Sequence, residues 1–181
     1  MENQRVRITK KMLKDSLIVF LARGSIHKIT VREICEEAQV NRSTFYKYYG
    51  SPYDLLEEIE NDVIVQINSY LTEDAVARDG KEMLIKILAF INENIDMSRV
   101  LLNNNIDPRF PERLIQLPTM RQIITRQLPD KYNEEDIEYI MDFAVNGGFS
   151  TIKKWINKDK RESPEKIAEL LNITIIKMLP V

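Results

Sequence analysis

The sequence predicts an all-α protein in which a short three-helix head precedes a larger helical body. Apolar residues recur at spacings of three and four through most of the 181 residues, and no alternating apolar and polar run of the kind a half-buried strand needs interrupts them. Only 5 Gly and 7 Pro occur, which excludes collagen-like and low-complexity chains and disfavours turn-dense β architectures. We therefore expect a head over residues 1–52 and a body over residues 53–181.

The first two helices of the head are predicted from periodicity and capping residues. Apolar residues at helical spacing indicate an amphipathic helix over about residues 9–23, which we expect to end at Gly24, a residue suited to a helix C-cap. Thr30 and Glu33 have the spacing of a capping box, and they predict the start of a short second helix.

A tight turn at residues 39–41 separates the second helix from the third. Asn41 can cap a third short helix over about residues 42–49. Pro52 suits the first position of a long fourth helix, because no amide partner is lost there. The fourth helix carries an apolar stripe at helical spacing: Leu55, Leu56, Ile59, Val63, Ile67 and Leu71.

The body continues the helical pattern with longer connections. We expect a helix over about residues 81–96, a segment over about 109–128 that Pro118 kinks or splits, a long helix that opens at Asn133 or Glu134 and runs to about 157, and a last helix over about 164–178 capped by Ser163.

Composition excludes several classes of protein. The 44% of apolar residues suffice for a real core, and the balance of 26 Lys and Arg against 28 Asp and Glu, a net charge of −2, argues against a polyanion-coating or disordered acidic chain. One Cys (Cys35) and one His (His27) leave neither a disulfide framework nor a Cys/His zinc site. We expect no metal, no cofactor, no membrane span and a cytoplasmic location, with Cys35 in the core and His27 in a solvated loop.

The net charge conceals an asymmetry between the two parts of the chain. Residues 1–52 hold 10 Lys and Arg against 5 Asp and Glu, a charge of +5, whereas the remainder holds 16 against 23, a charge of −7. A basic head on an acidic body indicates that the head meets a polyanion while the body stays away from it.

The second and third helices with their short turn form a helix-turn-helix pattern. Phe45 and Tyr49 are spaced i, i+4, so they share a face that can pack with the first two helices, and the opposite face carries Arg42, Ser43, Tyr46 and Lys47. This donor set suits a DNA major groove: arginine can bind guanine edges with two hydrogen bonds, hydroxyls can contact bases or phosphates, and tyrosine and lysine can hold phosphates.

Residues 29–34 (ITVREI), 38–51 (AQVNRSTFYKYYGS) and 54–56 (DLL) closely resemble the TetR family of bacterial transcriptional regulators, over about residues 5–60. The resemblance implies a DNA-binding head, a homodimer and an effector pocket in the C-terminal body. Carried over by position, it implies that Thr30 and Tyr46 contact phosphates, that Arg42, Ser43, Thr44 and Lys47 face the major groove, and that Phe45 is core.

Two residues depart from the family pattern. The family usually has glycine where Gln39 stands, so this turn must form without glycine's conformational freedom. The family often has a lysine, as a phosphate anchor, where Pro52 stands, and its absence predicts a shallower dependence of DNA binding on salt.

The body resembles more loosely a C-terminal domain of the Firmicutes type, through residues 147–156 (GGFSTIKKWI) and 163–165 (SPE). The resemblance implies a four-helix dimer interface made by the last two helices of each subunit. Two glycines that allow close approach and two apolar stripes fit this role; the alternative is that the stripes face only their own core. The interface residues expected are Gly147, Gly148, Phe149, Ile152, Trp155, Ile167, Leu170, Leu171, Thr174 and Met178.

Methionine and aromatic residues of the body are candidates for the lining of an apolar effector pocket, although such residues at helical spacing also build plain cores. The candidates are Met83, Phe90, Met97, Phe110, Met120, Ile123, Ile124 and Phe143. Neither the effector nor the operator sequence follows from these residues.

The function predicted is that of a dimeric DNA-binding transcriptional regulator, a repressor by family habit, that binds an approximately palindromic operator in double-stranded DNA and responds to a small molecule. The alternative is a ligand-sensing or coactivator-like module whose head, weakened at Gln39 and Pro52, no longer binds DNA. A helical enzyme is a third class, but the sequence offers no P-loop, nucleotide fingerprint or nucleophile elbow, and we predict that the protein is not an enzyme.

Overall fold

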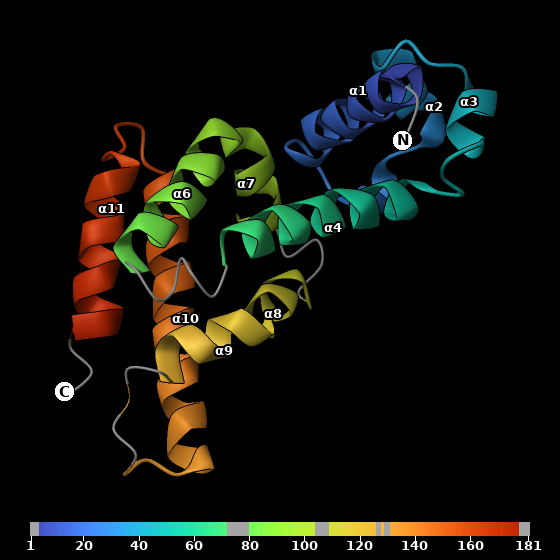
Figure 1. Ribbon diagram of the computed structural model, residues 1–181. Coiled ribbons are helices and arrows are strands. Elements are labelled where there is room, and N and C mark those ends of the chain that lie inside the picture. Colours follow the sequence, from blue (N-terminus) through green and yellow to red (C-terminus); the bar gives the residue numbers. More distant parts are fainter. Residues whose placement is uncertain (1–3, 72–79, 104–108, 126–127, 129–130, 178–181) are drawn as a thin grey trace.

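The computed structural model describes residues 4–71, 80–103, 109–125, 128 and 131–177, and every regular element within them is helical (Figure 1). This confirms the all-α prediction. The elements are α1 (Gln4–Leu21), a short 3₁₀ turn (Ile26–Lys28), α2 (Val31–Glu37), α3 (Arg42–Tyr46), α4 (Pro52–Tyr70), α6 (Gly80–Glu93), α7 (Ile95–Asn103), α8 (Arg109–Ile115), α9 (Pro118–Thr125), α10 (Glu134–Ile156), α11 (Pro164–Leu171) and a π-helical turn (Asn172–Lys177).

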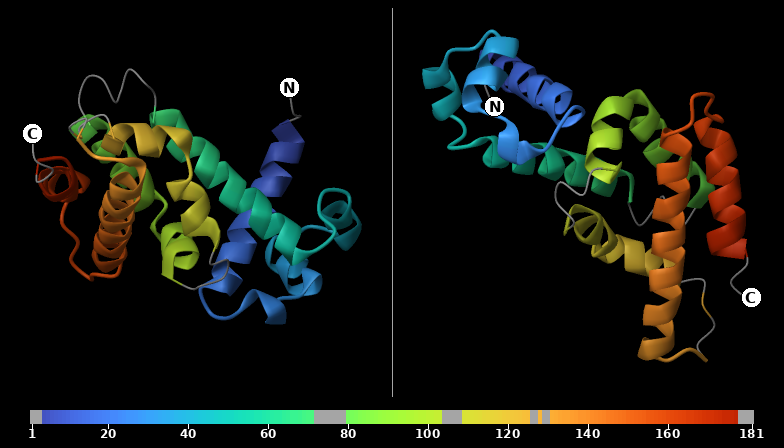
Figure 2. Two further views of the ribbon diagram at one scale, coloured as in Figure 1. Left: turned by 90° about the horizontal axis from the view of Figure 1, so that it is seen from below. Right: turned by 180° about the vertical axis from the view of Figure 1, so that it is seen from behind.

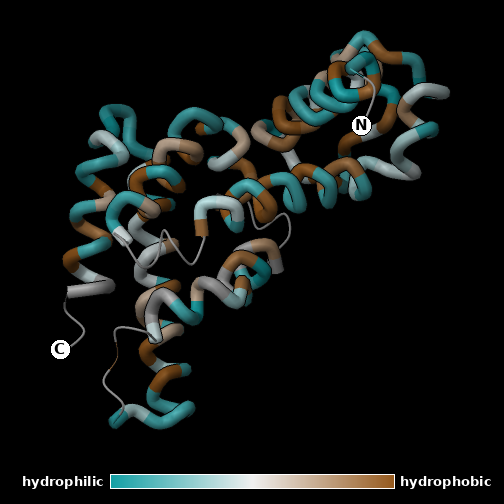
Figure 3. The backbone as a smooth tube through the Cα atoms, viewed as in Figure 1, coloured by the Kyte–Doolittle hydropathy of each residue, from teal (hydrophilic) through white to brown (hydrophobic). Residues whose placement is uncertain are grey.

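The head packs α1, α2, α3 and the first half of α4 around one core. The side chains of Leu13, Leu17, Ile34, Phe45 and Leu55 have no exposed surface, and they come from all four helices. Along α1 and α4, hydrophobic and hydrophilic residues alternate with the helical repeat (Figure 3), as expected of helices with one buried face.

Helix α1 begins earlier and ends differently from the sequence prediction. It starts at Gln4 and ends at Leu21, and no described glycine has a positive φ, so Gly24 is not a left-handed C-cap. Instead, the amides of Arg23 and Gly24 both donate to the carbonyl of Phe20, at 3.0 and 3.1 Å. These short-range hydrogen bonds close the last turn without a left-handed residue.

Helix α4 connects the head to the body. Ser51 is its N-cap and accepts a hydrogen bond from the amide of Asp54, and Pro52 occupies the first turn, as predicted. The two views of Figure 2 agree with Figure 1 that the head lies at one end of α4 and the body at the other. Its buried face extends from Leu55 to Leu71, so both parts of the molecule pack on the same helix.

The body is built from α6 to α11. Helix α11 packs on α6, while α10 packs against α7, α9 and α11. Three predictions are confirmed: Pro118 splits the segment at 109–128, Asn133 caps α10 in a capping box with Asp136, and Ser163 caps α11. The last helix, expected to continue to about residue 178, is α-helical only to Leu171 and π-helical beyond it.

Helix α7 was not predicted as a separate element. The expected helix over about 81–96 breaks at Asn94, whose side-chain amide donates to the carbonyl of Phe90 at 2.9 Å. The chain then restarts as α7, which Arg99 ties to the end of α10 by a 2.8 Å hydrogen bond to the carbonyl of Ile156. An asparagine that bonds its own backbone in this way competes with helical hydrogen bonds.

Candidate DNA-binding surface and apolar cavity

The capping box of α2 forms as predicted and occupies the hydroxyl of Thr30. The Glu33 amide donates to Thr30 Oγ1 at 3.2 Å, and both the amide and the hydroxyl of Thr30 donate to Glu33 Oε2, at 2.8 and 2.7 Å. These hydrogen bonds lower the pKa of Glu33, with the Thr30 hydroxyl as the larger contributor. Because the hydroxyl already donates to Glu33, a phosphate contact by Thr30 would have to share or replace that bond.

The turn of the helix-turn-helix requires a left-handed residue, and Gln39 supplies it. Gln39 has a φ of 53°, a positive value found at no other non-glycine residue among those described. This conformation lets the amide of Val40 donate to the carbonyl of Cys35 at 3.0 Å, which closes the end of α2. The expectation that this turn needs glycine-like geometry is confirmed, and the glutamine carries the steric cost of it.

Helix α3 is shorter than predicted, and one of its predicted caps is absent. It ends at Tyr46, not near residue 49, and Lys47 is its C-cap. Asn41 stands at the N-cap position with extended backbone angles, but its side chain makes no capping hydrogen bond. The helix is therefore held mainly by packing: Phe45 is fully buried, and its ring lies 5.5 Å from that of buried Tyr49.

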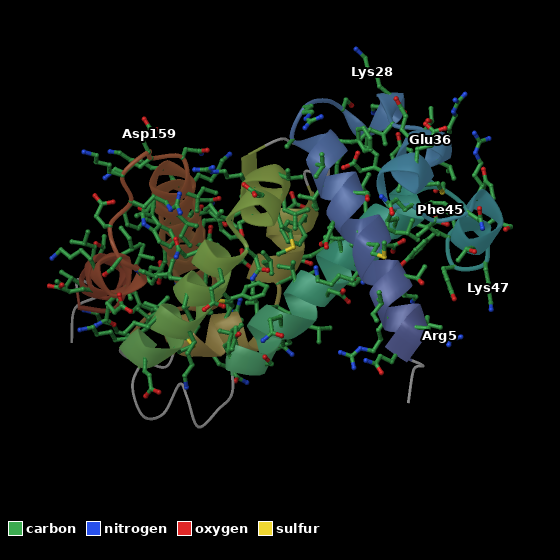
Figure 4. The ribbon with its side chains drawn as sticks, turned by 90° about the horizontal axis from the view of Figure 1, so that it is seen from above. Arg5, Lys28, Glu36, Phe45, Lys47 and Asp159 are labelled. Atoms are coloured by element: carbon green, nitrogen blue, oxygen red, sulfur yellow. The ribbon has the colours of Figure 1, made fainter. Side chains whose placement is uncertain are left out.

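The opposite face of α3 is open to solvent. Arg42, Ser43, Tyr46 and Lys47 are exposed, with Tyr46 at 58%, while Thr44 is half-buried. Figure 4 shows the Phe45 side chain inside the head and Lys28 and Lys47 projecting outward from it. The structure thus gathers five of the six predicted DNA-contacting residues on or next to α3, and it places Thr30 at the start of the neighbouring helix.

The charge of this surface favours an anionic partner. Residues 38–53 contain no Asp or Glu and two cations, Arg42 and Lys47. Nearby Arg32 is instead paired with Glu36 at 2.6 Å along α2. Buried Cys35 behind this surface has a pKa raised by desolvation, so its thiol is a core group, as predicted.

His27 is exposed to solvent, as predicted, and lies in the 3₁₀ turn before α2, where it also has a partner. Its Nδ1 forms a short hydrogen bond with the hydroxyl of Tyr53, and the two rings lie 5.8 Å apart. This contact ties the 3₁₀ turn to the first turn of α4.

An ion-pair cluster fixes α1 on α4 and so positions the head. Glu58 lies 2.7 Å from Lys14 and 3.3 Å from Lys10, and Lys14 also lies 2.6 Å from Asp62. Burial alone would raise the pKa of Glu58, but the hydrogen bonds and charge of the two lysines outweigh it and hold that pKa below its usual value. Conversely, burial would lower the pKa of Lys14, but its carboxylate partners raise it.

A cavity of about 150 Å³ lies in the body, and α4, α6, α7, α8, α9, α10 and α11 all contribute to its wall. Five of the predicted pocket residues line it: Met83, Phe90, Met97, Phe110 and Met120. Phe143 does not line it, because its side chain is 77% exposed on the outer face of α10; Ala144, Val145, Gly148, Phe149 and Ile152 line the cavity from that helix instead. The side chains of Ile123 and Ile124 lie outside the described residues.

The residues expected at the dimer interface divide into two groups. Trp155, Ile167, Leu171 and Gly148 are buried within the chain itself, and Trp155 also donates to the carbonyl of Glu162 at 2.9 Å, so these residues are core. Phe149 and Ile152 are half-buried at the cavity. Gly147, Leu170 and Thr174 are exposed, and Met178 lies outside the described residues.

Sequence reasoning missed several residues at both sites. Tyr139 and Ile173 are large, apolar and exposed. Tyr139 lies one turn before Phe143 on α10, and Ile173 lies three residues after Leu170, just beyond the end of α11. The i, i+4, i+8 spacing of Tyr139, Phe143 and Gly147 could have indicated one continuous outer face. The aliphatic cavity residues, such as Ile67 and Leu101, carry no signal of their own because any core residue has the same spacing.

Two family models match the chain over most of its length. The model described as "Bacterial regulatory proteins, tetR family" matches residues 17–59, and the model described as "Transcriptional regulator C-terminal region" matches residues 79–177. The first match covers the helix-turn-helix, and the second covers every described cavity residue except Val63 and Ile67 of α4. The fold and these matches define a helix-turn-helix transcriptional regulator. The chain belongs to the TetR family, a family of regulators rather than of enzymes.

Curated relatives agree with this assignment. The chain is 25% identical over 163 residues to the uncharacterized HTH-type transcriptional regulator YxbF of Bacillus subtilis, with 87% of the chain covered but only 42% of YxbF. It is 22% identical to the regulator YdgC of the same species, with 99% of the chain and 97% of YdgC covered. Over 88 residues, 48% of the chain and 45% of the relative, it is 28% identical to the dhaKLM operon transcriptional activator DhaS of Lactococcus lactis.

Solved structures share the fold at low sequence identity. A TetR transcriptional regulator from Streptococcus agalactiae superposes with a TM-score of 0.66 at 23% identity, covering 96% of both chains. The fatty acid degradation regulator FadR of Bacillus halodurans superposes with a TM-score of 0.67 at 14% identity, covering 94% of this chain and 99% of FadR. Among the described residues, none of the helices has the length and apolar character that crossing a membrane requires, and no cluster of metal-ligating side chains occurs.

Proposed function

We propose that the chain regulates transcription by binding operator DNA through α3, which enters the major groove. The observation that supports this most is the division of α3 into a buried face at Phe45 and an exposed face with Arg42, Ser43 and Lys47. In this role Arg42, Ser43, Thr44 and Lys47 face base edges, and Tyr46 and Thr30 contact phosphates. Thr44, being half-buried, reaches the groove only with its outer atoms.

A gel shift with duplex DNA from the protein's own upstream region tests this proposal. We expect specific binding at about 100 mM salt, and we expect the double variant Arg42→Ala, Lys47→Ala to lose it. Lys154→Ala, a matched loss of exposed charge on α10, should bind normally. Failure of the unmodified protein to bind any duplex at micromolar concentration would favour the alternative of a sensing module with an inactive head.

The proposal includes a homodimer that binds an approximately palindromic operator. The exposed apolar side chains of α10, α11 and the π-helical turn after α11 support a contact with a second copy: Tyr139, Phe143, Leu170 and Ile173. Apolar side chains this large are seldom left in water when they cluster, and a two-fold dimer would present two heads to two half-sites related by the same axis. Gly147 and Thr174 lie on the same exposed faces, whereas buried Trp155, Ile167 and Leu171 support this surface from inside.

The proposal also includes control by a small molecule in the cavity. Helix α4 contributes Val63 and Ile67 to the cavity wall and Leu55, Leu56 and Ile59 to the head core. A ligand that displaced the cavity end of α4 would therefore tilt the same helix on which the head is packed. In a dimer, that tilt changes the distance between the two recognition helices and their register with successive major grooves.

The direction of regulation follows one of two patterns. We propose repression, the usual mode in the family. The similarity to DhaS, which is described as a transcriptional activator, supports activation as a second candidate. Transcript levels of the neighbouring genes in a deletion strain decide between them, since loss of a repressor raises expression and loss of an activator lowers it. Either role places the protein with the chromosome, in the cytoplasm.

A further inference from the structure

We propose that the cavity binds an uncharged, apolar molecule about the size of a substituted benzene ring and rejects carboxylates of the same shape. This inference rests on the proposed function in one respect, that the bound molecule is the effector. The chemical selectivity follows from the wall of the cavity itself.

The described side chains of the cavity wall include no charged group that could pair with an ionised ligand. Among the side chains that the structure describes around the cavity, all are apolar except Ser98. The hydroxyl of Ser98 on α7 already donates to the carbonyl of Ile91 on α6 at 3.2 Å, across the junction between the two helices. An anion that entered would lose its hydration and find no cation in exchange, which is strongly unfavourable.

A buried carboxylate close in sequence to the cavity wall is already paired with a half-buried guanidinium. Arg113 lies next to cavity residue Leu114 on α8, and Glu60 lies one turn before cavity residue Val63 on α4. Arg113 Nη1 donates to Glu60 Oε2 at 3.0 Å, and Nη2 donates to Asn61 Oδ1 at 2.5 Å. This guanidinium is thus directed at α4. The arginines next to two other wall residues are also engaged elsewhere: Arg99 donates to the carbonyl of Ile156 at 2.8 Å, and Arg121 pairs with Glu134.

The size of the cavity limits the ligand to a few heavy atoms. A volume of about 150 Å³ is comparable to that of an engineered apolar cavity that remains dry and binds benzene, and it is below the range typical of drug-sized sites. Three of the lining residues, Met83, Met97 and Met120, have unbranched and adaptable side chains. These side chains can accommodate a substituent on the ring without a change in the packing of the helices.

Thermal unfolding with toluene and benzoate as probes tests the inference. Toluene at ten times its Kd stabilises the folded chain by about 1.4 kcal/mol and should raise Tm by about 3–6 °C in a chain of this size. Benzoate at the same concentration should leave Tm unchanged, with binding at least about a hundredfold weaker by calorimetry. Ala144→Leu, which fills the cavity from α10, should abolish the toluene shift, whereas Ala22→Leu, a matched change at an exposed position after α1, should retain it.

Each outcome has a separate meaning. Equal binding of benzoate and toluene, or a toluene shift that persists in Ala144→Leu, would overturn the inference; if that variant does not fold, Ala144→Val provides the same comparison with a smaller side chain. Operator binding measured with and without toluene tests the proposed function independently. If toluene binds but operator affinity does not change, control by an effector in this cavity is contradicted, whereas the inferred selectivity for uncharged apolar ligands is not.

Discussion

Gln39 adopts a backbone conformation that is sterically costly for any residue with a Cβ atom. Its φ of 53° is needed for the turn between α2 and α3. We expect Gln39→Gly to stabilise the protein by about 0.5–1 kcal/mol, because the relief of left-handed strain exceeds the added entropy of glycine in the unfolded chain. Urea denaturation measures the difference.

A matched glycine substitution provides the control for Gln39. Gln66→Gly, within α4, should instead destabilise by about 1 kcal/mol, because α4 has no positive φ at which glycine is favoured. If both variants were destabilised to the same degree, the turn at Gln39 would not be strained in solution.

Arg42 and Tyr46 test whether α3 reads bases and phosphates separately. We expect Arg42→Ala to weaken specific operator binding by about 1–3 kcal/mol and to relax the preference at one base pair, because a contact with two hydrogen bonds to a base edge is lost. Tyr46→Phe should weaken binding evenly across operator variants, because a phosphate contact carries no base information. Binding assays over a panel of single-base operator changes measure both. An even loss for Arg42→Ala would contradict base reading.

Among the contacts between helices, the α1–α4 ion-pair cluster makes stability depend on pH. Because the pKa of Glu58 is lowered on folding, its contribution is full above the ordinary value of 4.5 and is lost as the pH falls through the folded value. The pKa of Lys14 is raised, so its contribution is present below 10.5 and is lost as the pH rises through the folded value. The cluster therefore stabilises the head most between about pH 5 and pH 10.

We expect Glu58→Gln to lower stability by about 1 kcal/mol at neutral pH, a modest value because the pair is partly exposed to solvent. The difference from the unmodified protein should shrink as the pH falls below 4.5 and vanish once the pH is below the lowered folded pKa of Glu58. Denaturation at several pH values measures it, with Glu57→Gln on the exposed side of α4 as the control. A difference that persisted unchanged at pH 3 would show that the carboxylate charge of Glu58 is not what stabilises the head.

The helices themselves were largely predictable from the sequence, because their start signals are local. Thr30 with Glu33, Pro52, Asn133 with Asp136 and Ser163 each act within one helical turn, and each forms the expected cap or start. Helix ends were predicted less well: α1 ends at Leu21 and not at Gly24, α3 ends at Tyr46 and not near residue 49, and the break at Asn94 was not predicted.

The face that a helix turns toward its neighbours was harder to predict than the helix itself. Apolar stripes on α10 and α11 were visible in the sequence, but a stripe does not reveal whether it packs within the chain or against another molecule. Trp155 and Leu171 are buried in the chain, whereas Phe143, expected in the pocket, lies outside. Such assignments depend on how several helices pack together, and spacing within one helix does not contain that information.

For the molecule as a whole, the exposed face of α10 and α11 predicts how the dimer can be disrupted. We expect the double variant Phe143→Glu, Leu170→Lys to be monomeric by analytical ultracentrifugation, to unfold as the unmodified chain does apart from the lost association, and to lose most of its operator affinity. Trp155→Glu should instead unfold the chain, because Trp155 is 1% exposed. A folded monomer that bound the operator at full strength would refute the link between dimerisation and DNA binding.

Coupling between the cavity and the head must act in both directions. If an effector weakens operator binding by a given factor, saturating operator must weaken effector binding by the same factor, and coupling of this kind typically amounts to about 1–3 kcal/mol. Calorimetry of the effector with and without operator duplex measures it. If a molecule that occupies the cavity binds equally well with and without operator, that molecule is not the effector.

The shared role of α4 determines where hybrid regulators can be joined. The ion pairs of Lys14 with Glu58 and Asp62 attach the first part of this helix to the head, and from Val63 onward its buried side chains belong to the cavity. A transplanted head that ended at residue 52 would leave behind Leu55, Leu56 and Ile59 of its own core. A chimera that joins this head to the sensing body of another family member should therefore be spliced within the helix, between Asp62 and Val63, so that the head core and the cavity wall each come from one parent. The contacts of Arg113 with Glu60 and Asn61 cross this splice, so those two positions should keep the residues of the body's parent.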